Sequence, residues 1–164
     1  MIVILMGVSG VGKTTVGLLL AKALDAEFAE GDSYHPKANI EKMRRGIPLD
    51  DEDRRPWLET LSAEIGRWLA EDRTVVLACS ALRQAYRDVL VASRPGVHLV
   101  HLVGEEALLR SRLAQRRGHY MPPSLLSSQL ATLEHPKDAI TVDVSGTPEV
   151  IVEQILSALG RLAD

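Results

Sequence analysis

Short apolar segments alternate with longer amphipathic segments along the 164 residues of this chain. Apolar residues dominate residues 2–6, 74–78 and 97–103, as they do in strands that are covered on both faces. Residues 26–29 and 140–144 read as two further short strands. Apolar side chains recur at helical spacing in the remaining segments, which are residues 13–24, 40–45, 55–70, 82–92, 105–116, 124–133 and 148–162.

Alternating strands and helices predict an α/β sandwich with a parallel sheet. The sequence contains no internal repeat, low-complexity tract or linker, so we expect one domain over residues 1–164. The pattern places Pro56 in the first turn of the helix at 55–70, where a missing N–H costs nothing. In such sheets ligands bind at the carboxyl ends of the strands, so residues that follow a strand are the first candidates for chemistry.

The first predicted strand is followed by GVSGVGKT at residues 7–14 and then by a helix. Strand, Gly-x-x-x-x-Gly-Lys-Thr and helix together form the P-loop arrangement. Glycines let the backbone turn its N–H groups toward phosphate oxygens, and the helix start adds a positive dipole end. Lys13 can reach the β- and γ-phosphates, and the Thr14 hydroxyl can bind Mg²⁺. The expected nucleotide contacts are Gly7, Val8, Ser9, Gly10, Val11, Gly12, Lys13, Thr14 and Thr15.

Composition excludes several other classes of function. The formal net charge of −3 argues against a nucleic-acid coat or a polybasic membrane contact. The single cysteine, Cys79, allows no internal disulfide, which suits a reducing cytosol. No apolar stretch approaches the ~20 residues that span a bilayer, and the apolar run at residues 1–6 is too short for a signal peptide. We therefore expect a cytoplasmic protein without a nucleic-acid or membrane partner.

Asp32 comes three residues after the end of the second predicted strand, and we expect it to face the P-loop. A carboxylate there could accept a proton from a substrate hydroxyl or hold Mg²⁺ through water. It could instead cap a turn before Pro36. Residues 74–80 contain no Asp, and the chain has no guanine-reading NKxD motif, so a GTPase switch or an ATPase motor is disfavoured.

Four blocks of sequence resemble the small gluconate kinases, the gluconokinase family. They are GVSGVGKT at 7–14, GDSYHPKANIEKMRRGIPLDDEDRRPWL at 31–58, CSALRQAYRD at 79–88 and RRGHYMPPSLLSSQLATLEHP at 116–136. The second block is the most specific, because few other P-loop kinases carry its combination of residues. Two departures are visible: Arg83 stands where many members have Lys, and residues 118–121 read GHYM where relatives often have Phe.

This resemblance implies a fold and a reaction. The fold is the P-loop nucleoside-monophosphate-kinase-like fold, with a five-stranded parallel sheet, flanking helices and a mobile lid at about residues 116–124. The reaction is transfer of the γ-phosphate of ATP, with Mg²⁺, to D-gluconate to give 6-phosphogluconate. Members are typically homodimers. Each of these properties is an expectation for the present chain.

Site roles follow from the same resemblance, and each has a structural alternative. Asp32 would orient or deprotonate the 6-hydroxyl of gluconate, with Mg²⁺ held by Thr14 and through water by Asp32. His35 would bond a sugar hydroxyl or else a backbone carbonyl. Ser80 would lie near the metal and the substrate.

Arginines are the expected partners of the charged groups on both substrates. Arg54 and Arg87 would bind the gluconate carboxylate, because a guanidinium forks onto a carboxylate with two bonds. Alternatively, Arg54 forms a salt bridge within residues 50–55, and Arg87 lies on an exposed helix face. Arg116 would stabilise the transferring phosphoryl group, and Arg112 would contact the phosphates or stack on adenine. The alternative for both is a solvated basic helix end.

Two rival functions remain at this stage. One is a P-loop kinase for another small hydroxy acid such as shikimate, which the GDxxHP segment at residues 31–36 disfavours. The other is a nucleotide-binding module without turnover. Trp57 and Trp68 are expected in the core or in a dimer contact, and Asp51 and Asp53 are expected to cap a helix beginning near residue 55.

Overall fold

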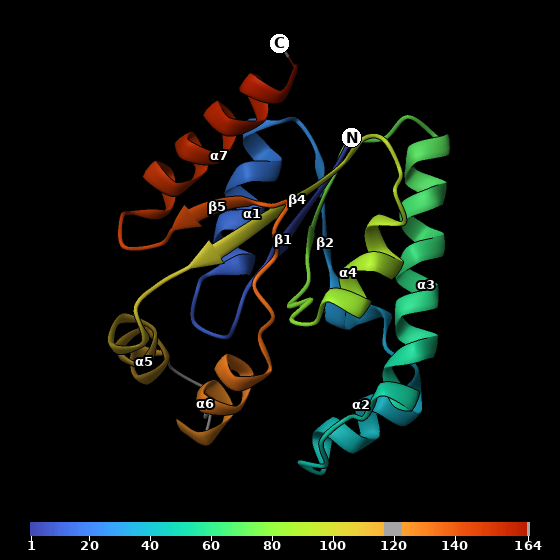
Figure 1. The fold of residues 1–164 in the computed structure, drawn as a ribbon, viewed down its shortest axis with the longest axis vertical. Helices are drawn as coiled ribbons and strands as arrows, with labels where there is room; N and C mark the ends of the chain where they lie inside the picture. The colour runs from blue at the N-terminus through green and yellow to red at the C-terminus, as the bar shows by residue number, and fades with distance from the viewer. Residues whose placement is uncertain (117–122, 164) are drawn as a thin grey trace.

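The computed structural model describes residues 1–116 and 123–163. One sheet of five parallel strands runs through the described part, in the order β2-β3-β1-β4-β5 (Figure 1). The sequence-based prediction of a five-stranded parallel sheet is therefore confirmed. The strands are β1 Ile2–Met6, β2 Glu27–Glu30, β3 Val75–Ala78, β4 Val97–Val103 and β5 Ile140–Asp143.

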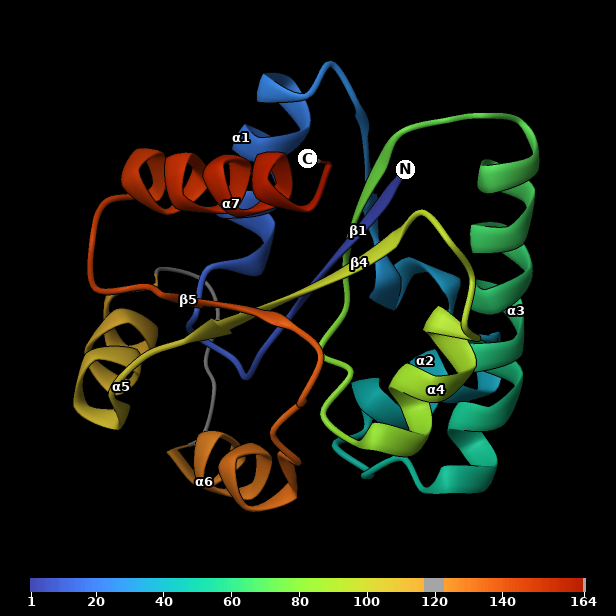
Figure 2. The ribbon, with the colours of Figure 1, turned by 45° about the horizontal axis from the view of Figure 1, so that its top comes forward.

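Helices cover both faces of the sheet. Alternate residues of the central strand β1 face opposite ways, so Val3 and Leu5 join one core while Ile2, Ile4 and Met6 join the other. Turning the molecule separates the two layers of helices (Figure 2). The first core packs under α1 (Lys13–Ala23) and α7 (Pro148–Ala163), and the second packs under α3 (Asp51–Ala70) and α4 (Gln84–Val91).

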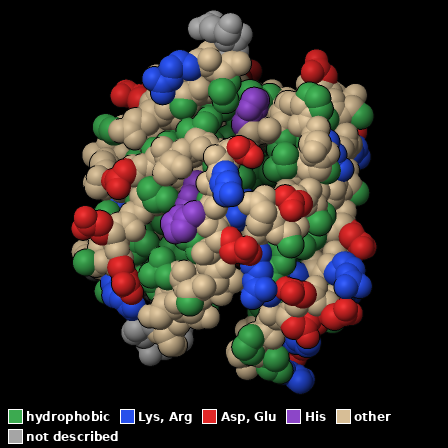
Figure 3. Space-filling model, viewed as in Figure 1, with side chains coloured by type: hydrophobic (Ala, Val, Ile, Leu, Met, Phe, Trp, Pro, Cys, Tyr) green, Lys and Arg blue, Asp and Glu red, His purple; other side chains and the backbone are tan. Residues whose placement is uncertain are grey.

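The remaining elements lie beyond the carboxyl ends of the strands (Figure 1). A short 3-10 helix, η1 (Gly31–Tyr34), and α2 (Lys37–Arg44) follow β2, while α5 (Glu106–Gln115) and α6 (Pro123–Thr132) follow β4. Most of the lid expected at 116–124 lies outside the described residues. The space-filling view shows an indentation between the part over α6 and the part over α2 (Figure 3). Charged side chains gather on the α2 and α3 side of this indentation.

The start of α3 corrects one sequence-based prediction. The helix begins at Asp51 instead of near residue 55, because Asp50 and Asp53 form a reciprocal capping box. The Asp53 N–H donates to Asp50 Oδ1 over 2.8 Å, and the Asp50 N–H donates to Asp53 Oδ2 over 3.0 Å. Pro56 consequently lies inside the helix and not in its first turn. The other predicted element ends differ from the observed ones by no more than three residues.

Two further expectations concern the two tryptophans and the possibility of a membrane-spanning helix. The sequence predicted Trp57 and Trp68 in the core or in a dimer contact, and both are buried in the core under α3. In the described ranges 1–116 and 123–163, no helix combines the length and apolar character needed to span a bilayer.

Candidate active site

The P-loop joins β1 to α1 and has the backbone that its glycines allow. Gly10 and Gly12 have φ values of 91° and 88°, in the left-handed region where other residues are strained. Gly12 is also the N-cap of α1. The loop therefore turns directly into the helix, and its N–H groups can face a bound anion.

Lys13 is held by its own loop. Its Nζ donates to the carbonyl of Gly7 over 2.9 Å and to that of Val8 over 3.3 Å. Burial lowers the pKa of Lys13, while the negative groups around it, which include Asp32 and Glu30, act in the opposite direction. The ammonium group therefore interacts electrostatically with carboxylates at the carboxyl end of β2 and just beyond it.

Thr14 bonds a carboxylate that sequence reasoning missed. Its hydroxyl donates to Glu30 Oε2 over 2.9 Å. Glu30 is the last residue of β2, two positions before Asp32, and its place at a strand's carboxyl end was the available signal. The described residues contain no group of three or more His, Cys, Asp or Glu side chains able to hold a metal. One hydroxyl and nearby carboxylates do fit Mg²⁺, which usually takes few protein ligands beside phosphate and water.

Asp32 presents a largely exposed carboxylate beside His35. The Asp32 side chain is 77% exposed, and its Oδ1 lies 3.9 Å from Nε2 of His35. Gly31, the preceding residue, is buried against β3, where an added Cβ would come within 2.8 Å of the Ala78 carbonyl oxygen. The chain therefore has to pass close to β3 immediately before it presents Asp32 to solvent.

His35 is fixed in place by two neighbours. Its imidazole stacks on the indole of Trp57 at a centroid distance of 4.3 Å. The side-chain amide of Asn39 lies 3.1 Å from His35 Nδ1 and donates to the Asp53 carbonyl over 2.7 Å. Burial lowers the pKa of His35, Asp32 opposes this, and Arg54 adds to it. A neutral imidazole that accepts at Nδ1 keeps its Nε2 proton directed toward Asp32.

Arg54 lies on the α4 side of the same region. Its Nη1 donates to the Tyr86 hydroxyl over 3.3 Å, and the guanidinium carbon is 5.6 Å from the Tyr86 ring centroid. The Tyr86 hydroxyl in turn donates to Asp51 Oδ1 over 2.6 Å, and Arg83 Nη1 lies 4.0 Å from the same carboxylate. The Tyr86 hydroxyl thus links Arg54 to the Asp51 carboxylate, which also lies near Arg83. Arg54 also interacts electrostatically with His35.

Arg87 has a different environment from the one expected. The sequence suggested either a gluconate ligand or an exposed helix residue, but the side chain is buried, with 1% of the residue exposed. Its guanidinium donates to the carbonyls of Ala81 over 2.7 Å and Glu134 over 2.6 Å. Its Nε has no partner among the described residues. Arg87 therefore ties two loops together, and contact with gluconate stays an untested prediction.

Ser80 and Cys79 follow β3 next to the P-loop. The Gly7 N–H donates to the Ser80 carbonyl over 3.3 Å, so Ser80 lies where the P-loop meets the segment that follows β3. Cys79 is buried, and this burial raises the pKa of its thiol to about 12. A thiol with that pKa is protonated at neutral pH and does not act as a nucleophile.

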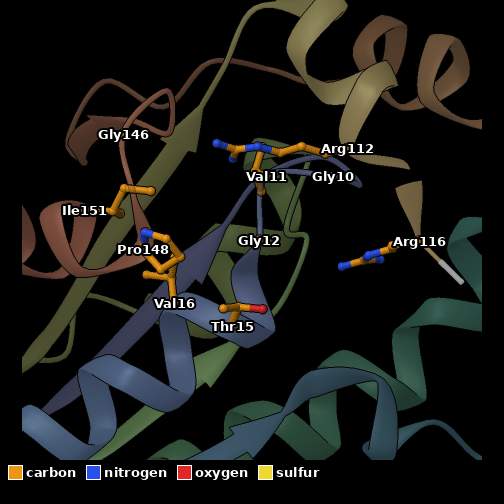
Figure 4. Close-up of a pocket in the computed structure, with 10 residues that line it drawn as sticks. All are labelled: Gly10, Val11, Gly12, Thr15, Val16, Arg112, Arg116, Gly146, Pro148 and Ile151. Carbon is orange, nitrogen blue, oxygen red and sulfur yellow. The ribbon is translucent and has the colours of Figure 1, made fainter. Parts of the chain in front are cut away.

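Arg112 and Arg116 line a cavity of about 260 Å³ on the α1 side of the P-loop. Figure 4 shows Arg112 lying across the loop at Val11 and Arg116 pointing toward the start of α1. Arg112 donates to the carbonyl of Val144, which restrains it. The other residues that line the cavity are Gly10, Val11, Gly12, Thr15, Val16, Gly146, Pro148 and Ile151.

Gln129 is a second residue that sequence reasoning missed. It lies on α6, and its side-chain Oε1 accepts a hydrogen bond from the Ser9 N–H over 2.6 Å. The available signal is a single amide side chain in a helix that otherwise contains apolar and small residues.

Comparison with known proteins extends this picture. Residues 2–136 match the model of a family described as an AAA domain. The chain is 42% identical to the thermosensitive gluconokinase of Escherichia coli K12, over 95% of this chain and 86% of that protein. It is 45% identical to the gluconokinase of Gluconobacter oxydans 621H, over 93% and 88% respectively.

Solved structures agree with these relatives. The structure of a gluconokinase from Sinorhizobium meliloti 1021 has 48% identity and a TM-score of 0.86, and the match covers 98% of this chain and 92% of that one. Shikimate kinase from Aquifex aeolicus has 20% identity and a TM-score of 0.66 over 99% of this chain and 98% of that one, which shows a shared fold alone. These matches confirm the P-loop nucleoside-monophosphate-kinase-like fold, and by sequence the chain belongs to the gluconokinase family.

Proposed function

We propose that this protein transfers the γ-phosphate of ATP to the 6-hydroxyl of D-gluconate, giving 6-phosphogluconate and ADP. The observation that carries the proposal is the position of Asp32, an exposed carboxylate two residues after Glu30, which accepts a hydrogen bond from Thr14 of the P-loop. A phosphate-binding ammonium and a hydroxyl-binding carboxylate on one site are what a small-molecule kinase needs. The relatives are named gluconokinases, and we therefore take gluconate as the acceptor.

The donor side of the proposal uses the P-loop and the neighbouring arginines. Backbone N–H groups of the P-loop would surround the phosphates, except those of Gly7 and Ser9, which are bonded to Ser80 and Gln129. Lys13 would lie at the β- and γ-phosphates. Arg116 would stabilise charge on the transferring phosphoryl group, and Arg112 would contact the nucleotide from its place across the loop. Thr14, with Glu30 and Asp32 directly or through water, would hold Mg²⁺, whose charge neutralises the phosphates when it is bound.

The acceptor side uses the residues that follow β2 and β3. Asp32 would take the proton of the 6-hydroxyl while the O6–phosphorus bond forms and the bond from phosphorus to the leaving ADP oxygen breaks. His35 would donate its Nε2 proton to a sugar hydroxyl, and Ser80 would line the junction between the two substrates. Arg54 would bind the gluconate carboxylate, which distinguishes gluconate from neutral glucose. The buried environment of Arg87 gives less support to a direct contact.

Two properties beyond the reaction belong to the same proposal. We expect the protein to act in the cytoplasm, where ATP is available, and to form a homodimer as members of its family typically do. Sedimentation of the purified protein at two concentrations tests the second point, and a single monomeric species at both would contradict it.

The direct experiment is ADP release from Mg-ATP with a panel of acceptors: D-gluconate, shikimate, glucose, glycerate and nucleoside monophosphates. The proposal expects a large rate with gluconate alone. Turnover with shikimate or another acceptor would keep the P-loop chemistry and overturn the acceptor assignment. ATP binding without acceptor-dependent ADP release would support a nucleotide-binding module instead.

A further inference from the structure

Gln129 reaches the P-loop from a helix whose apolar residues pack into the core. Leu126 is buried, and Leu130 is packed against the same core from the next turn of α6. Gln129 is adjacent to this apolar stripe and partly buried. From there its Oε1 accepts the Ser9 N–H over 2.6 Å, at a sequence separation of 120 residues.

The far end of α6 is anchored to the acceptor side of the site. The Glu134 N–H donates to the Leu82 carbonyl over 2.8 Å, and the buried guanidinium of Arg87 donates to the Glu134 carbonyl. The Glu134 carboxylate accepts the Gln84 N–H over 3.3 Å. These bonds fix α6 to the loop after β3, so Gln129 is presented to the P-loop from a rigid support.

The hydrogen bond to Ser9 determines the orientation of the Gln129 amide. A backbone N–H can only donate, so the amide oxygen faces Ser9 and the NH₂ group points elsewhere. Within residues 1–116 and 123–163, the structure gives that NH₂ group no protein acceptor. Ser9 directly follows Gly7 and Val8, whose carbonyls hold Lys13 Nζ. The Gln129 amide therefore contacts the P-loop at the residue next to the two carbonyls that hold the phosphate-binding ammonium.

We propose that the Gln129 NH₂ group donates a hydrogen bond to the γ-phosphate of bound ATP, while its oxygen holds Ser9. The amide would then contribute a neutral hydrogen-bond donor in addition to the positive charge of Lys13. It would strengthen the binding of ATP and not of ADP, because ADP has no γ-phosphate. This inference deepens the proposed function and rests on its assignment of a nucleoside triphosphate as donor.

Two substitutions separate the oxygen from the NH₂ group. Gln129→Ala removes both. Gln129→Glu keeps an acceptor for the Ser9 N–H, removes the donor and adds a negative charge. Calorimetry would measure the dissociation constants of Mg-ADP and of a non-hydrolysable Mg-ATP analogue for each variant. Gln154→Glu is the matched control, because it makes the same chemical change at an exposed position on α7.

A lost hydrogen bond to a charged group predicts about tenfold to hundredfold weaker binding of the ATP analogue in both variants. The factor by which the affinity for Mg-ADP falls should be at least ten times smaller. Gln129→Glu should bind the ATP analogue no better than Gln129→Ala does. The inference is overturned if glutamate restores analogue binding, or if both nucleotides lose affinity equally, since either outcome would confine Gln129 to holding the loop. Because these are binding measurements, they remain decisive even if gluconate is not the acceptor.

Discussion

The imidazole ring of His35 lies nearly parallel to the indole ring of Trp57, with 4.3 Å between ring centroids and 13° between ring planes. The indole N–H of Trp57 also donates to the Gly31 carbonyl over 2.8 Å. Gly31 and His35 stand on either side of Asp32 in the chain. One core tryptophan of α3 therefore fixes both ends of the short segment that presents the Asp32 carboxylate.

Substitution of Trp57 by Phe tests this relationship. A phenyl ring can still stack on His35, but the buried Gly31 carbonyl loses its donor, which should lower the free energy of unfolding by about 1–3 kcal/mol. Because the Asp32 segment is then less well fixed, kcat/KM for gluconate should fall about tenfold, while KM for ATP changes less than about twofold. Urea denaturation and steady-state kinetics measure these quantities. Ile65→Val, in the same helix and core, controls for lost stability, and an equal effect of that control on gluconate turnover would contradict the account.

Substitution of Arg54 tests carboxylate recognition. Arg54→Met should raise KM for gluconate by about tenfold or more, because a charged hydrogen-bonded pair is lost, with KM for ATP nearly unchanged. Arg54→Lys should recover only part of the loss, since an ammonium lacks the fork of a guanidinium. Arg55→Met is the matched control, because Arg55 is exposed and paired with Glu52. If both methionine variants behave alike, Arg54 is not the carboxylate ligand.

Removal of the Lys13 side chain tests the donor site. Lys13→Ala should lower kcat by about a hundredfold or more, because the ammonium group stabilises charge on the transferring phosphoryl group. The free energy of unfolding should change little, since burial of the charge opposes the bonds it makes to Gly7 and Val8. Circular dichroism and urea denaturation check the fold, and Lys22→Ala, at an exposed position, is the control. An unfolded Lys13 variant would reveal a structural role in place of the catalytic one.

His101 predicts a pH dependence of stability. Burial, together with the nearby His135 and Arg87, lowers the pKa of His101 to about 4 from an ordinary 6.5. The unfolded chain therefore binds a proton that the folded protein excludes, so the contribution of His101 is complete above pH 6.5. It is lost progressively as the pH falls from 6.5 to about 4.

The measurement is the free energy of unfolding of wild type and His101→Gln at pH 7.5 and pH 5. The decrease between the two pH values should be smaller in the variant, because the buried imidazole no longer titrates. His98→Gln, on the same strand, is the control and should retain the decrease of the wild type. An unchanged decrease in His101→Gln would show that other groups, such as His35, account for the acid sensitivity.

The elements that the sequence predicted well are those with a local cause. The strands are short apolar runs, and the glycines that precede Lys13 specify a tight loop whatever surrounds it. Pro56 predicts a first helical turn near residue 55, whereas the Asp50–Asp53 capping box starts α3 at Asp51. Both signals are local. The hydrogen bonds of the cap determine where the helix begins, although proline is favoured in the first turn of a helix.

The parts of the site that were missed depend on contacts between distant segments. Arg87 is buried because the segment after α6 returns to the loop after β3, which brings the Glu134 carbonyl to its guanidinium. The contact between Gln129 and Ser9 has the same origin. The pairing of Glu30 with Thr14 required β2 and β1 to be placed in one sheet with β3 between them. Local spacing along the chain carries none of this information.

Product identity tests the central claim most directly. The purified protein is incubated with Mg-ATP and D-gluconate, and the product is offered to 6-phosphogluconate dehydrogenase with NADP⁺. We predict NADPH formation in proportion to ADP released by the wild-type protein, and its loss by about a hundredfold or more in Asp32→Ala with ATP binding retained. ADP release without NADPH formation, or undiminished turnover by the Asp32 variant, would contradict the proposed reaction or its acceptor site.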